Sequence, residues 1–207
     1  MEQRTDDWFA VRLGRVTASR IADVTAKTKT GWGAGRANYK AQLIAERLTG
    51  QRQESFTNAA MQWGIDTEEQ ARVAYAFLEG QKVIEEAFVT HPTILDAGAS
   101  PDGLVGNDGL VEIKCPNTAT HIETLKGGAI PGKYVGQMQW QMACTGRKWC
   151  DFVSFDPRMP EEMQLFVYRL MRDDGQIAEL EQMVRDFLAE VEADVAELVS
   201  LYRKEAA

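Results

Sequence analysis

Apolar residues recur along most of the chain at the three- or four-residue spacing of amphipathic helices, and in shorter stretches they suit strands. The helical spacing predicts helices near residues 6–13, 37–48, 58–78, 117–125, 134–144 and 175–203. Strands are predicted near residues 83–115, 149–155 and 165–170. Because the chain has no internal repeat and no long linker, we expect a single α/β (α+β) domain over residues 1–207.

The segment between the first two long helices is less regular. Thr17 or Ser19 is expected to cap a short helix that follows it. Residues 27–36 are polar and rich in glycine, which predicts a mobile loop, and they lack the Gly-Lys-Ser/Thr of a nucleotide-binding P-loop. The alternative is that this loop contacts a DNA backbone through Lys27, Lys29 and Arg36.

The predicted C-terminal helix carries one apolar stripe along its whole length. Its members are Ile177, Leu180, Val184, Phe187, Val191, Val195, Leu198 and Tyr202. This stripe favours packing along the helix's own domain, and an oligomer or partner interface is the alternative. The opposite face is acidic and unsuited to DNA contact.

Composition narrows the class of protein. The chain has 207 residues, of which 44% are hydrophobic, so we expect a globular domain with a sizeable core. No stretch approaches the ~20 apolar residues of a membrane span, and we expect no signal peptide. The three cysteines, Cys115, Cys144 and Cys150, suggest reduced thiols in a cytoplasmic protein and are too few for a four-cysteine iron–sulfur cluster.

The net charge of −8 is unevenly distributed. Residues 1–60 carry ten Lys or Arg against six Asp or Glu, whereas residues 173–207 carry three against ten. A basic N-terminal part permits contact with phosphates, and the acidic remainder keeps nucleic acid off other surfaces.

The most informative chemistry lies in the run Ser100-Pro101-Asp102-Gly103-Leu104 and the later run Glu112-Ile113-Lys114. Alternate side chains of a strand share a face, so Glu112 and Lys114 point one way while Ile113 points to the core. A turn at residues 106–109 returns the chain and brings Asp102 beside Glu112. Paired carboxylates suit Mg²⁺ or Mn²⁺, and Lys114 can orient or deprotonate an attacking water or screen phosphate charge.

The alternative for this motif is a non-functional ion pair, because a Glu-x-Lys pair on a strand usually lies on a solvent-exposed face. The apolar neighbours favour a central strand, where a charged face needs a reason. Other segments of the chain, described next, also support a functional role for this motif.

The spacing Asp102, Glu112, Lys114 resembles the PD-(D/E)xK nuclease signature. From about Trp8 to Pro157 the chain resembles the phage lambda-type exonucleases, the YqaJ-like viral alkaline exonucleases of recombination. The resemblance is carried by six blocks in family order: Trp8 with Arg12-Leu13-Gly14 and Thr17-Ala18-Ser19; Trp63-Gly64 with Glu68; Ser100 to Leu104; Glu112 to Pro116; Gln137-Met138-Gln139; and Asp156-Pro157-Arg158.

The resemblance implies a restriction-endonuclease-like core, with a central mixed β-sheet flanked by helices and a long C-terminal helix. It implies that Glu68 and Gln137 join the catalytic set of Asp102, Glu112 and Lys114. Gln139 is the alternative to Gln137 if the register shifts by two. From residues alone, Glu68 and Gln137 are ordinary surface positions. Mg²⁺, as two ions that Mn²⁺ could replace, is expected on Asp102, Glu112, the Ile113 carbonyl and Glu68.

In the resembled family, residues matching Arg12, Thr17 and Ser19 form a pocket for a terminal 5′-phosphate, to which Trp8 belongs. From spacing alone, the same residues predict a capped helix with a surface arginine. One departure is that Ala119, Thr120 and His121 stand where the lambda-type enzyme has a basic residue. His91 and His121 match no zinc spacing, and His121 is expected to be structural or to lie near the substrate path.

The resemblance further implies a processive 5′→3′ exonuclease that degrades one strand of linear duplex DNA and leaves a 3′ single-stranded tail. It implies a homotrimeric ring, a single-strand annealing recombinase as partner, and a phage or prophage gene expressed in a bacterial cytoplasm. Two alternatives stay open. One is another PD-(D/E)xK nuclease, such as an endonuclease, resolvase or 3′ nuclease, and the other is a non-catalytic module that binds DNA ends.

Overall fold

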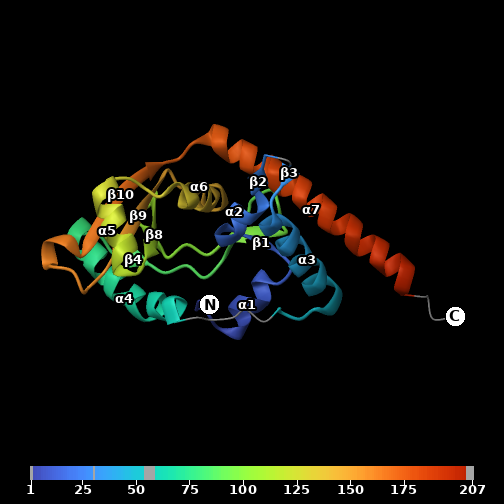
Figure 1. The fold of residues 1–207 in the computed structure, drawn as a ribbon, viewed down its shortest axis with the longest axis horizontal. Helices are drawn as coiled ribbons and strands as arrows, with labels where there is room; N and C mark the ends of the chain where they lie inside the picture. Colours follow the sequence, from blue (N-terminus) through green and yellow to red (C-terminus); the bar gives the residue numbers. More distant parts are fainter. Residues whose placement is uncertain (1, 30, 54–58, 204–207) are drawn as a thin grey trace.

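The computed structural model describes residues 2–29, 31–53 and 59–203, and it has a mixed α/β fold (Figure 1). The main sheet has five strands in the order β10-β9-β8-β7-β4. Their bounds are Leu165–Met171, Trp149–Phe155, Gly109–Lys114, Gly103–Val105 and Val83–Ile84. Strands β8 and β9 are parallel and the other neighbours antiparallel, so the sheet is mixed, as the sequence predicts.

Smaller strands and helices complete the described chain. A three-stranded sheet has the order β1-β6-β5, with bounds Val16–Thr17, Ala97–Ala99 and Val89–Thr90. A hairpin is formed by β2 (Lys27–Thr28) and β3 (Gly31–Trp32). The helices are α1 (Asp6–Arg12), α2 (Ile21–Val24), α3 (Ala34–Thr49), α4 (Ala59–Glu79), α5 (Thr118–Gly127), α6 (Gly132–Thr145) and α7 (Asp174–Tyr202), with 3-10 turns at Ala18–Arg20 and Glu161–Met163.

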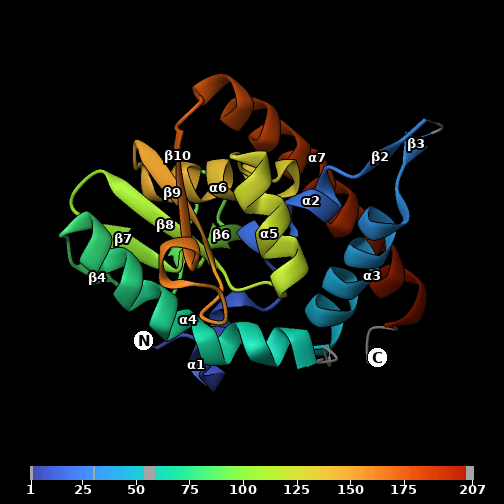
Figure 2. The same cartoon turned by 60° about the vertical axis from the view of Figure 1, so that its left-hand side comes forward.

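Helices α4 and α6 cover opposite faces of the main sheet (Figure 2). On one face, Val111 and Ile113 of β8 pack with Ala71 and Tyr75 of α4. On the other face, Leu110 packs with a cluster that includes the α6 methionines Met138 and Met142. The period of two along β8 therefore sends Glu112 toward α6, and its apolar neighbours toward α4.

Helix α7 runs diagonally across the molecule and packs against α3 (Figure 1). Five residues of its apolar stripe are buried, namely Ile177, Leu180, Val184, Phe187 and Val191, which agrees with packing along its own domain. The stripe leaves the core toward the C-terminal end, where Leu198 and Tyr202 are exposed. In the part of the chain that the structure describes, no helix is long and apolar enough to cross a membrane.

The structure corrects two local predictions near the N-terminus. Residues 27–36 are no plain loop, because they contain the β2–β3 hairpin, which stands out from the body (Figure 2), and the start of α3. Arg36 does not face DNA, since its guanidinium is buried and forms a bidentate ion pair with Glu190 of α7 at 2.8 and 2.9 Å. Neither Thr17 nor Ser19 caps α2, because a 3-10 turn comes between and no side chain caps the helix.

Candidate active site

The β7–β8 hairpin places the two predicted metal-binding acids next to each other. Gly103 pairs with Val111 in the antiparallel register, so the preceding residue, Asp102, lies opposite Glu112. The backbone N–H of Ile113 donates to Asp102 Oδ2 at 2.7 Å, which fixes this carboxylate at the end of β8. The predicted hairpin is therefore observed, and it sets the geometry of the site.

Glu112 is buried, with 1% of its surface exposed, and is surrounded by donors. Gln137 Nε2 donates to its Oε1 at 2.7 Å, and Gln141 Nε2 donates to its Oε2 at 2.5 Å. Lys114 forms an ion pair with the same carboxylate. A buried carboxylate needs such partners, since an unpaired one would cost several kcal/mol.

One of these donors was not predicted, and one predicted alternative does not contact Glu112. Gln141, four residues after Gln137 on the same helix, is fully buried and donates to Glu112, a role that the sequence did not predict. Gln139, the alternative to Gln137, faces away: its amide bonds Met171 O and accepts from Asp173 N.

Charge at the site is strongly coupled. Burial raises the pKa of Asp102 well above its usual value, and the carboxylates of Glu112 and Glu68 raise it further against the opposing charge of Lys114. Burial opposes the charge on Lys114, but Glu112 and Asp102 outweigh it and raise the pKa of the amine. Lys114 therefore keeps its positive charge beside these carboxylates, which suits the predicted screening of phosphate charge.

Glu68 reaches the same region from α4. It lines a pocket of about 500 Å³ together with Ile113, Lys114, Cys115 and Tyr134. Burial raises the pKa of Cys115 to about 12, so the thiol there is protonated and no nucleophile. The pocket opens at the end of β8, where α4 and α6 approach from opposite faces of the sheet.

The donor set fits a hard divalent cation, with one restriction. Asp102, Glu112 and Glu68 concentrate negative charge, which a divalent ion would neutralise, and carboxylate oxygens are the ligands that Mg²⁺ prefers. Within residues 2–29, 31–53 and 59–203, however, no three His, Cys, Asp or Glu side chains are gathered closely enough to hold a metal by themselves. Bound metal would therefore also need water, substrate phosphate or backbone oxygen.

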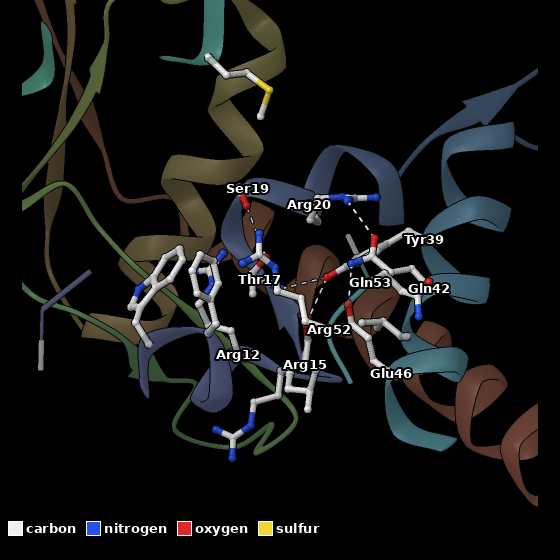
Figure 3. Close-up of a pocket in the computed structure, with 15 residues that line it drawn as sticks. Arg12, Arg15, Thr17, Ser19, Arg20, Tyr39, Gln42, Glu46, Arg52 and Gln53 are labelled. Atoms are coloured by element: carbon white, nitrogen blue, oxygen red, sulfur yellow. Dashed lines mark hydrogen bonds between the residues drawn. The ribbon is translucent and has the colours of Figure 1, made fainter. Parts of the chain in front are cut away.

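The residues predicted to bind a terminal phosphate line a second pocket of about 350 Å³ (Figure 3). Trp8, Arg12, Thr17 and Ser19 all contribute to its wall, with Arg20 and Arg52 nearby. The Thr17 and Ser19 hydroxyls lie 3.4 Å apart. The structure thus brings all four predicted residues together.

In the part of the chain that the structure describes, the charge of Arg12 meets an aromatic ring and a hydroxyl instead of a carboxylate. Its guanidinium lies 4.0 Å from the Trp8 ring centroid and donates to Ser100 Oγ at 2.8 Å. Among the described residues, no carboxylate is within ion-pair distance of it. Burial lowers its pKa to about 10, and the nearby charge of Arg52 adds to this against the opposing influence of Tyr39. A half-buried cation without an ion-pair partner among the described residues suits an incoming anion.

Ser100 connects Trp8 and Arg12 to the segment that carries Asp102, and the sequence predicted no role for it. Its hydroxyl accepts from Trp8 Nε1 at 3.0 Å as well as from Arg12, and it stands two residues before Asp102. Met61 lines both pockets, so the two cavities adjoin. The only sequence signal for Ser100 was its place in the run Ser100 to Leu104.

Two other predicted groups are structural. His121 is fully buried between Ser154 Oγ and Met163 O, each 2.8 Å from a ring nitrogen, so it does not line a substrate path. Asp156 is held by Arg158 Nε at 2.7 Å and by Thr118 Oγ1 at 2.7 Å. Burial opposes its charge, but these hydrogen bonds prevail and lower the pKa of Asp156 to about 2.

A mixed sheet with a paired-carboxylate site at the end of a central strand defines a class of α/β nuclease-like proteins, and comparison with known proteins specifies the family. The model of the YqaJ-like viral recombinase domain matches residues 7–148. The chain therefore belongs to the YqaJ-like viral recombinase family, as the sequence motifs predict.

Solved structures agree with this membership. Two structures of the alkaline exonuclease LHK-Exo from Laribacter hongkongensis, one of them in complex with dAMP, are 55% identical to the chain with a TM-score of 0.91, and cover 98% of this chain and 100% of theirs. A phage related exonuclease from Haemophilus somnus 129PT is 16% identical, has a TM-score of 0.70 over 89% of this chain and 96% of its own, and supports the fold alone. No curated protein matches. The family and the LHK-Exo match support a nuclease function.

Proposed function

We propose that the chain is a Mg²⁺-dependent 5′→3′ exonuclease that acts on the ends of linear duplex DNA and leaves a 3′ single-stranded tail. The observation that carries this proposal is the adjacency of two unlike pockets. One is lined by Glu68 and Lys114 beside Asp102 and Glu112, and the other by Arg12, which has no ion pair among the described residues. An enzyme that must recognise a terminal phosphate and cut the neighbouring bond needs such a pair. The 55% identity to an alkaline exonuclease supports the same activity.

Each protein group has a role in this proposal. Bound Mg²⁺, on Asp102, Glu112, Glu68 and the Ile113 carbonyl, would supply Lewis-acid stabilisation of the phosphodiester and activation of water. Lys114, as an ammonium, offsets negative charge that develops on the phosphate. Gln137, which donates to Glu112, orients that carboxylate and can reach a water beside it.

The second pocket accounts for the choice of strand end. The Arg12 guanidinium offers a charge-assisted hydrogen bond to a terminal phosphate, while Thr17 and Ser19 offer hydroxyl donors. Trp8 holds Arg12 in place by ring contact and through the shared Ser100 hydroxyl. A 5′-phosphate seated here would direct the adjoining bond toward the carboxylates.

The remaining proposals concern processivity, assembly and partners, and they are based on the family resemblance. A homotrimeric ring around DNA would retain the substrate between cuts, a single-strand annealing recombinase would receive the product strand, and the protein would act in the bacterial cytoplasm as a phage or prophage product. The family membership over residues 7–148 supports these proposals.

A digestion time course tests the activity. Linear duplexes labelled at either end, with 5′-phosphate or 5′-hydroxyl termini, and a closed circular duplex are incubated with Mg²⁺, with Mn²⁺ or with EDTA. We expect loss of the 5′ label first, faster on phosphorylated ends, no cutting of the circle, and no activity in EDTA. Cutting of the circle would establish an endonuclease instead, and binding without cutting would establish a non-catalytic module.

A further inference from the structure

Glu68, a predicted metal ligand, forms ion pairs with two arginines. Arg4 Nη2 lies 2.5 Å from its Oε2, and Arg72 Nη2 lies 2.9 Å from its Oε1. Both carboxylate oxygens therefore already have a cation. A metal that binds Glu68 would share an oxygen with one of these arginines, and repulsion between the two cations favours release of the arginine.

The two arginines are not equivalent. Arg72 also pairs with Glu69 at 2.5 Å and with Glu85 at 2.7 Å, and its side chain is only 13% exposed. Arg4 is 44% exposed and, in the part of the chain that the structure describes, has ion-pair contact with Glu68 alone. Arg72 is thus fixed in a network, whereas Arg4 is free to leave.

The backbone at Arg4 is built to keep this residue at the site. Arg4 has a φ of 69°, the only positive φ of a described residue other than glycine, and this conformation costs about 1–2 kcal/mol. The preceding Gln3 compensates, because its Nε2 donates to Glu86 O at 2.8 Å and to Pro101 O at 2.9 Å. On the other side, Thr5 caps α1. Gln3 therefore ties Arg4 to the residue directly before Asp102.

The same pocket holds Arg4 together with Lys114 and Tyr134. An arginine released from Glu68 would stay within this pocket, where a substrate phosphate is expected. Guanidinium groups bind phosphate oxygens at least as well as carboxylates. The Arg4 contact could therefore be exchanged from Glu68 to DNA without loss of a partner for the charge.

We propose that Arg4 is an internal counter-cation of the active site, which pairs with Glu68 when metal and DNA are absent and transfers to a DNA phosphate when Glu68 binds metal. The exchange makes DNA and metal binding mutually favourable, because each ligand removes a cost of binding the other. This inference rests on the proposed metal site, and it adds a positioning residue that the nuclease motif does not contain.

Metal affinity, measured without reference to activity, tests the proposal. Mn²⁺ binding is followed by electron paramagnetic resonance in the full chain, alone and with a short duplex whose terminal linkages are non-hydrolysable phosphorothioates. Without DNA, we expect Arg4→Ala to bind Mn²⁺ about two- to fivefold more tightly than the wild type, the range of a partly exposed ion pair. In the wild type, we expect the duplex to increase the affinity for Mn²⁺. In Arg4→Ala, this increase should be smaller by the same two- to fivefold factor.

Three further variants separate the causes. Arg4→Lys keeps the charge and should stay close to the wild type. Gln3→Ala removes the tie and should shift both affinities in the direction of Arg4→Ala. Arg185→Ala is the matched control, since Arg185 is 43% exposed and, among the described residues, forms its ion pair with Glu181 and its hydrogen bonds with Thr93. It should change neither affinity.

The outcomes distinguish this inference from the proposed function. If the wild type binds Mn²⁺ and Asp102→Asn abolishes that binding, but Arg4→Ala and Gln3→Ala leave the affinity and its response to DNA unchanged, the Arg4 inference is overturned and the metal site stands. If the wild type binds no Mn²⁺ with or without DNA, the metal site is overturned and the inference falls with it.

Discussion

Two neighbouring regions handle charge in opposite ways: the carboxylate site, formed by Asp102, Glu112 and Lys114, and the arginine pocket, lined by Trp8, Arg12, Thr17 and Ser19. Glu112 is compensated inside the protein by Lys114, Gln137 and Gln141. Arg12 has only the Trp8 ring and a neutral hydroxyl, and among the described residues it meets no carboxylate. An internally compensated site is stable while it waits for its ligands, whereas an uncompensated one gains most when the ligand arrives.

The largest expected effect on digestion comes from a substitution in the carboxylate site. Asp102→Asn keeps the shape and the Ile113 N–H contact but removes a charge from the predicted metal site. We expect Mg²⁺-dependent digestion to fall by about a thousandfold or more, since the metal supplies several kcal/mol. Initial rates of label release measure this, with thermal unfolding as the control for folding. Near-normal digestion by a folded variant would exclude Asp102 as a ligand.

A smaller effect is expected from the arginine pocket. Arg12→Ala should reduce the preference for 5′-phosphate over 5′-hydroxyl ends by about 10- to 100-fold, the worth of a charge-assisted hydrogen bond. The ratio of kcat/KM on the two kinds of end measures it. An equal loss on both ends would assign Arg12 to folding rather than to recognition of the phosphate.

The two glutamine partners of Glu112 sharpen the comparison within one site. Gln141→Leu leaves a fully buried carboxylate oxygen without its donor, so we expect unfolding free energy to fall by about 1–3 kcal/mol. Gln137→Leu, at a half-buried position, should cost less stability and more activity. Urea unfolding and digestion rates are measured on both variants, and the reverse order would contradict these roles.

Asp156 gives the smallest and most specific expected effect, because hydrogen bonds from Arg158 and Thr118 stabilise its charged carboxylate. Its pKa of about 2 lies below that of an unfolded aspartate, about 4. The carboxylate therefore contributes stability that is present above about pH 4 and is lost as the pH falls through about 2. In Asp156→Asn, the free energy of unfolding should fall less between about pH 4 and about pH 2 than it does in the wild type, by up to about 2 kcal/mol. Unfolding free energies between pH 2 and 5 measure it, and an unchanged slope would contradict it.

Local pattern predicted the elements and the directions of their side chains. The period of two around residue 112 placed Glu112 and Ile113 on opposite faces, and the glycine-rich turn at 106–109 placed Asp102 beside Glu112. Helix spacing predicted the long helices, and the buried half of the α7 stripe. These features depend on neighbours a few residues apart, so sequence periodicity is enough to predict them.

Cap chemistry and surface contacts were harder to predict. Thr17 and Ser19 are good cap residues, yet they line a pocket because a 3-10 turn precedes α2. Arg36 lies in a basic stretch, but α7 crosses α3 and supplies Glu190 as its partner. Periodicity gives the face of an element on which a residue lies and says nothing of which distant element will cover that face.

The sequence by itself therefore determined the fold class, the acidic hairpin and the family, because these follow from local spacing and from motifs in order along the chain. Only the tertiary structure decided that Gln141 joins Gln137 in holding Glu112, that Ser100 receives hydrogen bonds from Trp8 and Arg12, and that Arg4 reaches Glu68. The physical reason is the same in each case. Partners 29, 88 and 64 residues apart meet only after the chain has packed, and the burial that results decides which polar contacts must be made.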